Sequence, residues 1–153
     1  MTISRTGGCQ CGEIRYEISA EPHTVYVCHC TDCQRQSSSA FGMSMSVARE
    51  AFKITKGTPK TWRTVTDSGR EKICKFCGTC GTRLYHEPAR NKAIYNLKPG
   101  TLDDTSWFVP AGHLWTQSAQ AWVPLPDDAA TLTYETQPPD FQPLFDRFQT
   151  RGR

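Results

Sequence analysis

Residues 77–81 read Cys-Gly-Thr-Cys-Gly, a turn of the kind that directs two thiols toward one metal ion. The glycine after the second cysteine accepts the positive φ that such a turn often needs. Two thiolates leave two positions of a tetrahedral zinc site to fill. Cys9 and Cys11 are the natural complement, because two residues apart on an extended segment their sulfurs point to the same side. We therefore expect a closed structural zinc site that ties the N-terminal hairpin to the middle of the chain, made by Cys9, Cys11, Cys77 and Cys80.

A neighbouring cysteine makes the register of this turn ambiguous. Cys74 and Cys77 also form a CxxC pair. The glycine follows Cys80, however, whereas Cys74 lies within a strand-like run at residues 71–76. We therefore predict that Cys77 and Cys80 are the ligands and that Cys74 is a small buried hydrophobic side chain. The alternative for the whole group is a set of free buried cysteines.

A second cluster, in the stretch Val-Cys-His-Cys-Thr-Asp-Cys-Gln at residues 27–34, places three cysteines within six residues. Three thiolates can hold zinc and leave a fourth coordination position open, which is typical of catalytic rather than structural zinc. His29 and Asp32 lie between the cysteines and are expected to point away from the ion. We therefore predict a catalytic-type zinc site made by Cys28, Cys30 and Cys33.

The charge of this second cluster indicates its chemistry. Three thiolates around Zn²⁺ leave one net negative charge, so the ion is a weaker Lewis acid than zinc on three neutral histidines. Such an ion is better suited to holding a soft thiolate than to generating hydroxide. We therefore predict that a small thiol binds there and reacts with an electrophile. The alternative is a structural site in which Cys74 or His113 supplies the fourth ligand.

Composition limits the class of protein. The chain has 153 residues, about the length of one domain, and no apolar run long enough for a transmembrane helix. It contains 8 cysteines and no apolar signal segment, which favours metal binding in a reducing compartment over disulfides. The net charge of +3 is too small to indicate nucleic-acid binding. We expect a cytoplasmic protein with two zinc ions, no membrane partner and no nucleic-acid partner, while the oligomeric state stays open.

Alternating hydrophobic and polar residues predict a mainly β, antiparallel fold with short helical pieces only. The helical pieces are expected at residues 32–38 and 141–148, and one turn is expected at Asp67-Ser68-Gly69. We expect a single zinc-binding β domain at residues 1–135 and a proline-containing arm at 136–153. Short strands are expected at residues 14–18, 24–27, 41–47, 52–55, 60–66, 72–76, 82–85 and 92–97.

Three blocks of sequence carry a family resemblance: GGCQCGEIRYEI at 7–18, CHCTDCQR at 28–35 and FCGTCGTRL at 76–84. They resemble the signature blocks of the glutathione-dependent formaldehyde-activating enzyme family, which includes centromere protein V, and the resemblance covers about residues 5–125. It implies a β-tent fold of several small sheets and carbon–sulfur lyase activity on glutathione and formaldehyde. It also implies the same division of the cysteines into a structural and a catalytic-type zinc site.

The chain departs from this family beside the second cluster. Gln34 follows the third cysteine, where the family usually carries a basic residue, and residues 36–39 replace a glycine-containing turn. These departures bear on the identity of the substrate. The main alternative to an enzyme is a non-catalytic, zinc-stabilised module that binds protein or nucleic acid.

An anionic thiol needs cationic partners, and His113 is a candidate either for acid–base chemistry or for a structural role. The candidates for carboxylate binding, by residue type, are Arg35, Arg49, Lys53 and Arg70.

Overall fold

The computed structural model describes residues 2–66 and 69–151. The chain divides into two compact units that alternate along the sequence. The first contains Met1–Pro22 and Ser46–Ser106, and the second contains His23–Met45 and Trp107–Arg153. Strand β4 (Gly42–Ala48) carries the chain from the second unit into the first. The expected domain boundary after residue 135 stays a prediction.

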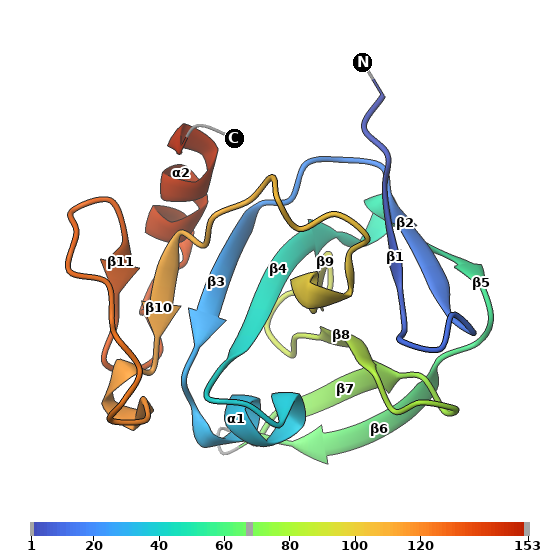
Figure 1. Ribbon diagram of the computed structural model, residues 1–153, viewed down its shortest axis with the longest axis horizontal. Helices are drawn as coiled ribbons and strands as arrows, with labels where there is room; N and C mark the ends of the chain where they lie inside the picture. Colours follow the sequence, from blue (N-terminus) through green and yellow to red (C-terminus); the bar gives the residue numbers. More distant parts are fainter. Residues whose placement is uncertain (1, 67–68, 152–153) are drawn as a thin grey trace. The chain divides into compact units, whose positions relative to one another are not determined.

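The first unit contains two groups of antiparallel strands (Figure 1). Strands β1 (Arg5–Gly8), β2 (Arg15–Ile18) and β5 (Phe52–Lys56) form a sheet in the order β1-β2-β5. The other group has the order β9-β8-β7-β6 and consists of β6 (Lys60–Val65), β7 (Glu71–Phe76), β8 (Arg83–Glu87) and β9 (Ile94–Leu97). Two 3-10 helices lie at Arg49–Ala51 and Pro99–Thr101.

Aromatic packing forms the core of the first unit. Tyr16 and Ile18 are fully buried, as the alternation along β2 predicts. The ring of Phe52 lies 5.3 Å from that of Tyr16 and 4.8 Å from that of Tyr85. These contacts join β2, β5 and β8, and so hold the loops at the ends of these strands in place.

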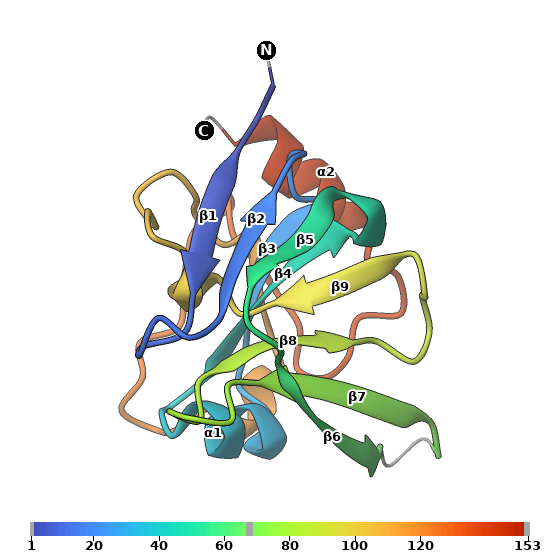
Figure 2. The same ribbon diagram turned by 90° about the vertical axis from the view of Figure 1, so that its right-hand side faces the viewer.

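The second unit is built around β3 (Thr24–Cys28), which is buried along its whole length. β10 (Gly112–Leu114) pairs with it in parallel and also pairs in parallel with β11 (Leu132–Thr133). Helix α2 (Gln142–Thr150) packs against β3 (Figures 1 and 2). Its buried residues are Leu144 and Phe148. A Cβ on Gly112 would lie 2.6 Å from the Leu144 side chain, so only glycine allows this approach. Helix α1 (Thr31–Ser37) and a 3-10 helix at Thr116–Ser118 complete the unit.

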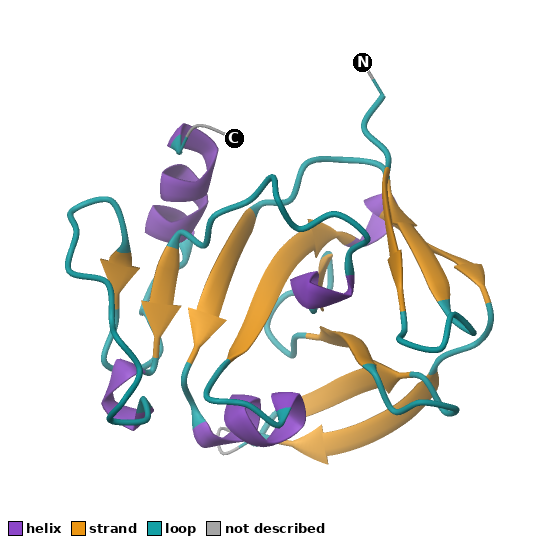
Figure 3. Cartoon of the chain, in the orientation of Figure 1, coloured by secondary structure: helices purple, strands orange, loops and turns teal. Residues whose placement is uncertain are grey.

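The predicted mainly β fold is confirmed (Figure 3). Across the described residues, eleven strands form two sheets, and α1 and α2 fall on the two expected helical pieces. Each expected strand is present within a few residues, whereas β1, β10 and β11 were missed, because segments of two to four residues are too short to show alternation. The turn expected at Asp67 and Ser68 lies outside the described residues. Among the described residues, no helix is both long enough and apolar enough to cross a membrane.

Two candidate metal centres

The first unit brings four cysteines together. Cys9 and Cys11 lie on the loop between β1 and β2, and Cys77 and Cys80 lie on the turn between β7 and β8. Their four sulfurs lie within 4.8 Å of one another. The Sγ of Cys11 is 3.6 Å from that of Cys9 and 3.7 Å from that of Cys77. Thiolates around one tetrahedral zinc are separated by roughly 3.8 Å, given a Zn–S distance of about 2.3 Å, so the spacing fits a four-thiolate site.

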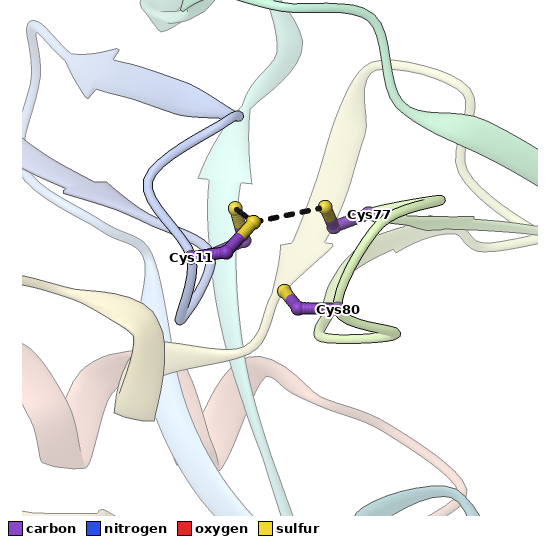
Figure 4. Close-up of side chains that lie close together, drawn as sticks. Cys11, Cys77 and Cys80 are labelled. Carbon is purple, nitrogen blue, oxygen red and sulfur yellow. Dashed lines mark hydrogen bonds between the residues drawn. The ribbon is translucent and has the colours of Figure 1, made fainter.

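The close-up in Figure 4 shows how two separate loops supply these thiols. Cys11 enters from one loop, Cys77 and Cys80 enter from the other, and their sulfurs point toward one another. Backbone N–H groups also point at the cluster: Ile14 donates to the Sγ of Cys9 at 3.2 Å. Such donors stabilise thiolates and fix their direction.

The turn at Cys80 has the conformation that the sequence predicts. Gly81 has a φ of +78°, which glycine adopts without strain. The Sγ of Cys80 lies 3.1 Å from the Oγ1 of Thr82. Hydrogen bonds from the Thr82 side chain, then from the backbone N–H groups of Thr82 and Cys11, lower the pKa of Cys80 to about 5. The chain therefore holds this sulfur as a thiolate at neutral pH, the form that binds zinc.

The second unit brings Cys28, Cys30 and Cys33 together where β3 ends and α1 begins. Their sulfurs also lie within 4.8 Å of one another. Cys28 is buried, whereas the other two are half-buried. The backbone N–H of Cys33 donates to the Sγ of Cys30 at 3.3 Å, so the first turn of α1 orients the cluster. The amide of Gln36 lies 3.5 Å from the Sγ of Cys33, a contact that the sequence did not predict.

Among the described residues, no fourth Cys, His, Asp or Glu side chain joins this group. Asp32 is exposed on α1. Cys74 is buried in β7 with 1% of its surface exposed, as predicted. His29 and His113 contact each other instead, with the Nε2 of His29 2.9 Å from the Nδ1 of His113.

The histidine pair is uncharged at neutral pH. Burial, followed by the charge of His29, lowers the pKa of His113 to about 4. Burial also lowers the pKa of His29, which is fully buried and packs edge-on against Phe41. In two neutral imidazoles one ring donates and the other accepts, so this contact joins the residue that follows β3 to β10 without adding charge.

The electrostatics of the second cluster fit a bound cation. Hydrogen bonding to the thiols of Cys30 and Cys33, and then burial, raise the pKa of Cys28 well above its usual range. Three thiolates this close together repel one another, and a divalent cation offsets that repulsion. Thiolates are soft ligands, which suits zinc better than it suits magnesium or calcium. Both cysteine groups can therefore hold a metal ion, and their donor atoms are consistent with zinc.

A hollow of about 540 Å³ lies beside α1 in the second unit. Of the four cations proposed from sequence, Arg35 lines this hollow, while Arg49, Lys53 and Arg70 belong to the first unit. Arg49 there lies 5.1 Å from the centre of the Tyr95 ring, a cation–π contact. No pattern in the sequence pointed to Gln120, because this residue reaches the hollow from far along the chain. The residues that line the hollow are Thr31, Gln34, Arg35, Ser38, Ser39, Ala40 and Gln120.

Comparison with known proteins decides the family. The family model of the glutathione-dependent formaldehyde-activating enzyme matches residues 4–118, more than half of the chain. The chain belongs to this family. The resemblance carried by the three sequence blocks is thereby confirmed, and both cysteine groups lie inside the matched range of the formaldehyde-activating family.

The fold also has a counterpart among solved structures. The chain is similar to a crystal structure of a Rhodobacter sphaeroides protein, a Northeast Structural Genomics target, with 19% sequence identity and a TM-score of 0.53. The match covers 66% of this chain and 90% of that chain. At this identity the likeness concerns the fold alone.

Proposed function

We propose that this protein is a zinc-dependent enzyme of the carbon–sulfur lyase type, with a β-tent fold. It joins a small thiol of the glutathione type to an aldehyde such as formaldehyde, and catalyses the reverse reaction. The observation that carries the proposal is the number of thiols in the second cluster. Three sulfurs lie within 4.8 Å of one another, and across the described chain no fourth Cys, His, Asp or Glu joins them.

The two cysteine groups have different roles in this proposal. Cys9, Cys11, Cys77 and Cys80 hold a structural zinc, because four thiolates satisfy a tetrahedral ion and leave no position for a substrate. Cys28, Cys30 and Cys33 hold a catalytic-type zinc. Zinc bound by these three residues would supply a soft Lewis acid that favours the thiolate form of a small thiol.

Neighbouring residues orient the sulfurs of the second cluster by hydrogen bonding. The N–H of Cys33 and the amide of Gln36 orient two of the three sulfurs. His113, with a pKa of about 4, is a poor proton acceptor at neutral pH, so we assign the His29–His113 pair a structural role.

The reaction itself is an addition. The thiol sulfur forms a bond to the carbonyl carbon, the π bond of the carbonyl opens, and the proton that leaves sulfur ends on the carbonyl oxygen. With glutathione and formaldehyde the product is S-hydroxymethylglutathione. Because this addition also proceeds without an enzyme, the gain in rate must be measured against the uncatalysed reaction.

Three measurements on the purified protein test the proposal. Zinc per chain should be two by elemental analysis, and calorimetry should show glutathione binding that Cys28→Ser abolishes. Exchange between ¹³C-formaldehyde and S-hydroxymethylglutathione, followed by NMR, should be faster with the protein than without it. Two zinc ions with no glutathione binding and no increase in exchange rate would refute the enzyme and favour the zinc-stabilised binding module.

A further inference from the structure

We propose that the hollow beside α1 is the subsite for a carboxylate of the thiol substrate, with Arg35 as the counter-charge and the Gln34–Gln120 pair as positioning residues. This inference rests on the proposed function, since it concerns the thiol that enters at the second cluster. The hollow is suitable in size, because small-molecule sites usually have volumes of about 300–1,000 Å³.

The hollow and the cysteine cluster use adjacent faces of the same short helix. Thr31, Gln34 and Arg35 line the hollow and follow the i, i+3, i+4 spacing of one helix face, and Ser38, the residue that caps the C-terminal end of α1, also lines it. Thr31 directly follows Cys30 and Gln34 directly follows Cys33 in the chain. The hollow thus begins one residue after two of the three cysteines, and a ligand whose sulfur enters at the cysteines would extend along α1 to reach it.

The lining of the hollow consists largely of hydrogen-bond donors suited to an anion. Arg35 contributes a guanidinium, which pairs with carboxylates in a bidentate geometry. Thr31, Ser38 and Ser39 contribute hydroxyl groups. None of the described lining residues is acidic, so nothing in that set opposes a carboxylate. A single cation among hydroxyl groups matches one carboxylate of a small molecule better than it matches a polyanion.

One wall of the hollow is held by a chain of side-chain amides. The Nε2 of Gln34 donates to the backbone oxygens of His29, at 2.8 Å, and Ser118, at 2.9 Å. The Oε1 of Gln34 accepts from the Nε2 of Gln120 at 3.1 Å. The Oε1 of Gln120 in turn accepts from the Nε1 of Trp122 at 2.7 Å. Gln34 thus fixes the segment that carries Gln120 against α1, next to the cysteine cluster.

Position 34 requires a side chain with both a donor and an acceptor, because Gln34 donates to two backbone oxygens and accepts from Gln120. A lysine can donate to the two carbonyl oxygens but cannot accept from Gln120. Gln34 and Gln120 are therefore positioning residues, which act on the substrate by holding the wall of the hollow, whereas Arg35 contacts the carboxylate directly.

Calorimetry on the zinc-loaded protein tests the role of Arg35 with three ligands. Glutathione has a thiol and carboxylates, S-methylglutathione has the carboxylates without a free thiol, and 2-mercaptoethanol has a thiol without a carboxylate. Arg35→Gln should weaken glutathione and S-methylglutathione by about tenfold, as expected for a lost charged hydrogen bond, and leave 2-mercaptoethanol unchanged. Arg90→Gln, a change at an exposed arginine of the first unit, is the matched control and should alter none of the three.

This experiment gives different results if the carboxylate subsite is wrong and if the proposed function is wrong. If the unmodified protein binds glutathione and Arg35→Gln binds it equally well, the carboxylate subsite is wrong and the proposed function stands. If the unmodified protein does not bind 2-mercaptoethanol and binds glutathione no better than S-methylglutathione, the thiol makes no contribution and the proposed function is wrong. In that case, binding of the two glutathione compounds that depends on Arg35 would still support an anion site, and the absence of any binding would overturn both proposals.

A double-mutant cycle with uncharged replacements tests the positioning role. Gln34→Leu and Gln120→Leu should each weaken S-methylglutathione about threefold or more, as expected when one hydrogen bond is lost, without changing the affinity for 2-mercaptoethanol. The double variant should bind no more weakly than Gln34→Leu alone, because both changes break the same hydrogen bond between the two amides. An equal loss for both ligands, or additive losses in the double variant, would overturn the positioning role.

Discussion

The two cysteine clusters differ in how their ligands are distributed along the chain. The four-cysteine cluster joins two loops, with Cys11 and Cys77 separated by 66 positions. The three-cysteine cluster takes all of its ligands from residues 28–33. A metal that closes a long loop restricts the unfolded chain much more than one that binds within a single turn. This difference supports the proposal that a metal in the first cluster stabilises the fold, whereas a metal in the second takes part in chemistry.

The clusters also differ in how the protein supports their charge. At the first, the Thr82 side chain and backbone N–H groups lower the pKa of Cys80 to about 5. At the second, the neighbouring thiols and burial raise the pKa of Cys28. The protein itself thus favours the thiolate form of Cys9 and Cys80 in the first cluster, whereas the pKa of Cys11 is raised to about 12. In the second cluster the pKa values of both Cys28 and Cys30 are raised, so that cluster depends more strongly on a cation.

The largest expected difference is in stability. Because structural zinc contributes roughly 10 kcal/mol of folding free energy in zinc-finger peptides, Cys80→Ser should prevent folded protein from accumulating. Cys28→Ser should lower the free energy of unfolding by less than about 2 kcal/mol, since its ligands are local. Soluble yield and urea unfolding followed by circular dichroism measure both. Equal destabilisation by the two changes would mean that both sites are structural.

The next largest expected difference is in the pH at which each cluster releases zinc. Protons compete with zinc for thiolates, and they compete better where the thiol pKa is high. The pKa values of Cys9 and Cys80 are lowered in the first cluster, although that of Cys11 is raised, whereas those of Cys28 and Cys30 are both raised in the second. The second cluster should therefore release zinc first as the pH falls. The two release steps should be separated by about one pH unit or more. A chromogenic zinc indicator follows both steps, and Cys28→Ser should lack the one at higher pH; release of both ions together would contradict the comparison.

A smaller effect is expected when a side chain that contacts a cysteine of the first cluster loses its hydroxyl group. Thr82→Val keeps the shape of the side chain but removes its hydroxyl contact with the Sγ of Cys80. We expect a loss of about 1 kcal/mol in the free energy of unfolding, with glutathione affinity unchanged. Thr133→Val, at an exposed position of β11, is the control and should leave the stability unchanged. A fall in glutathione affinity without a change in stability would reverse the assignment of the clusters.

The smallest effect is expected when a side chain that contacts a cysteine of the second cluster loses its amide group. Gln36→Leu removes the amide that lies 3.5 Å from the Sγ of Cys33. Because this contact is long, zinc affinity at the second cluster should fall by about tenfold, the low end for residues that orient metal ligands. Competition with a chelator measures the affinity, and Gln117→Leu, at an exposed position of the same unit, is the control. If the free energy of unfolding falls while zinc affinity holds, Gln36 supports the fold rather than the metal.

Much of the two clusters could be predicted because the relevant geometry is local. The spacing of Cys28, Cys30 and Cys33 places three sulfurs on one turn, and the glycine after Cys80 selects the register of the other turn. Alternation also located β2 and its buried residues, since successive side chains of a strand point to opposite faces. These features depend on backbone geometry over a few residues, which the order of residue types specifies directly.

The hollow beside α1 could not be predicted in this way. Gln34 stood out only as a departure from the family, and its partner Gln120 is separated from it by 86 positions. The parallel pairing of β3 with β10 was equally hidden, because three residues carry no readable period. The sequence by itself determined which cysteines gather and that their soft thiol ligands suit a zinc-like ion. The tertiary structure alone decided which distant side chains lie beside them, because packing between segments depends on shape and hydrogen bonding across the fold rather than on local periodicity.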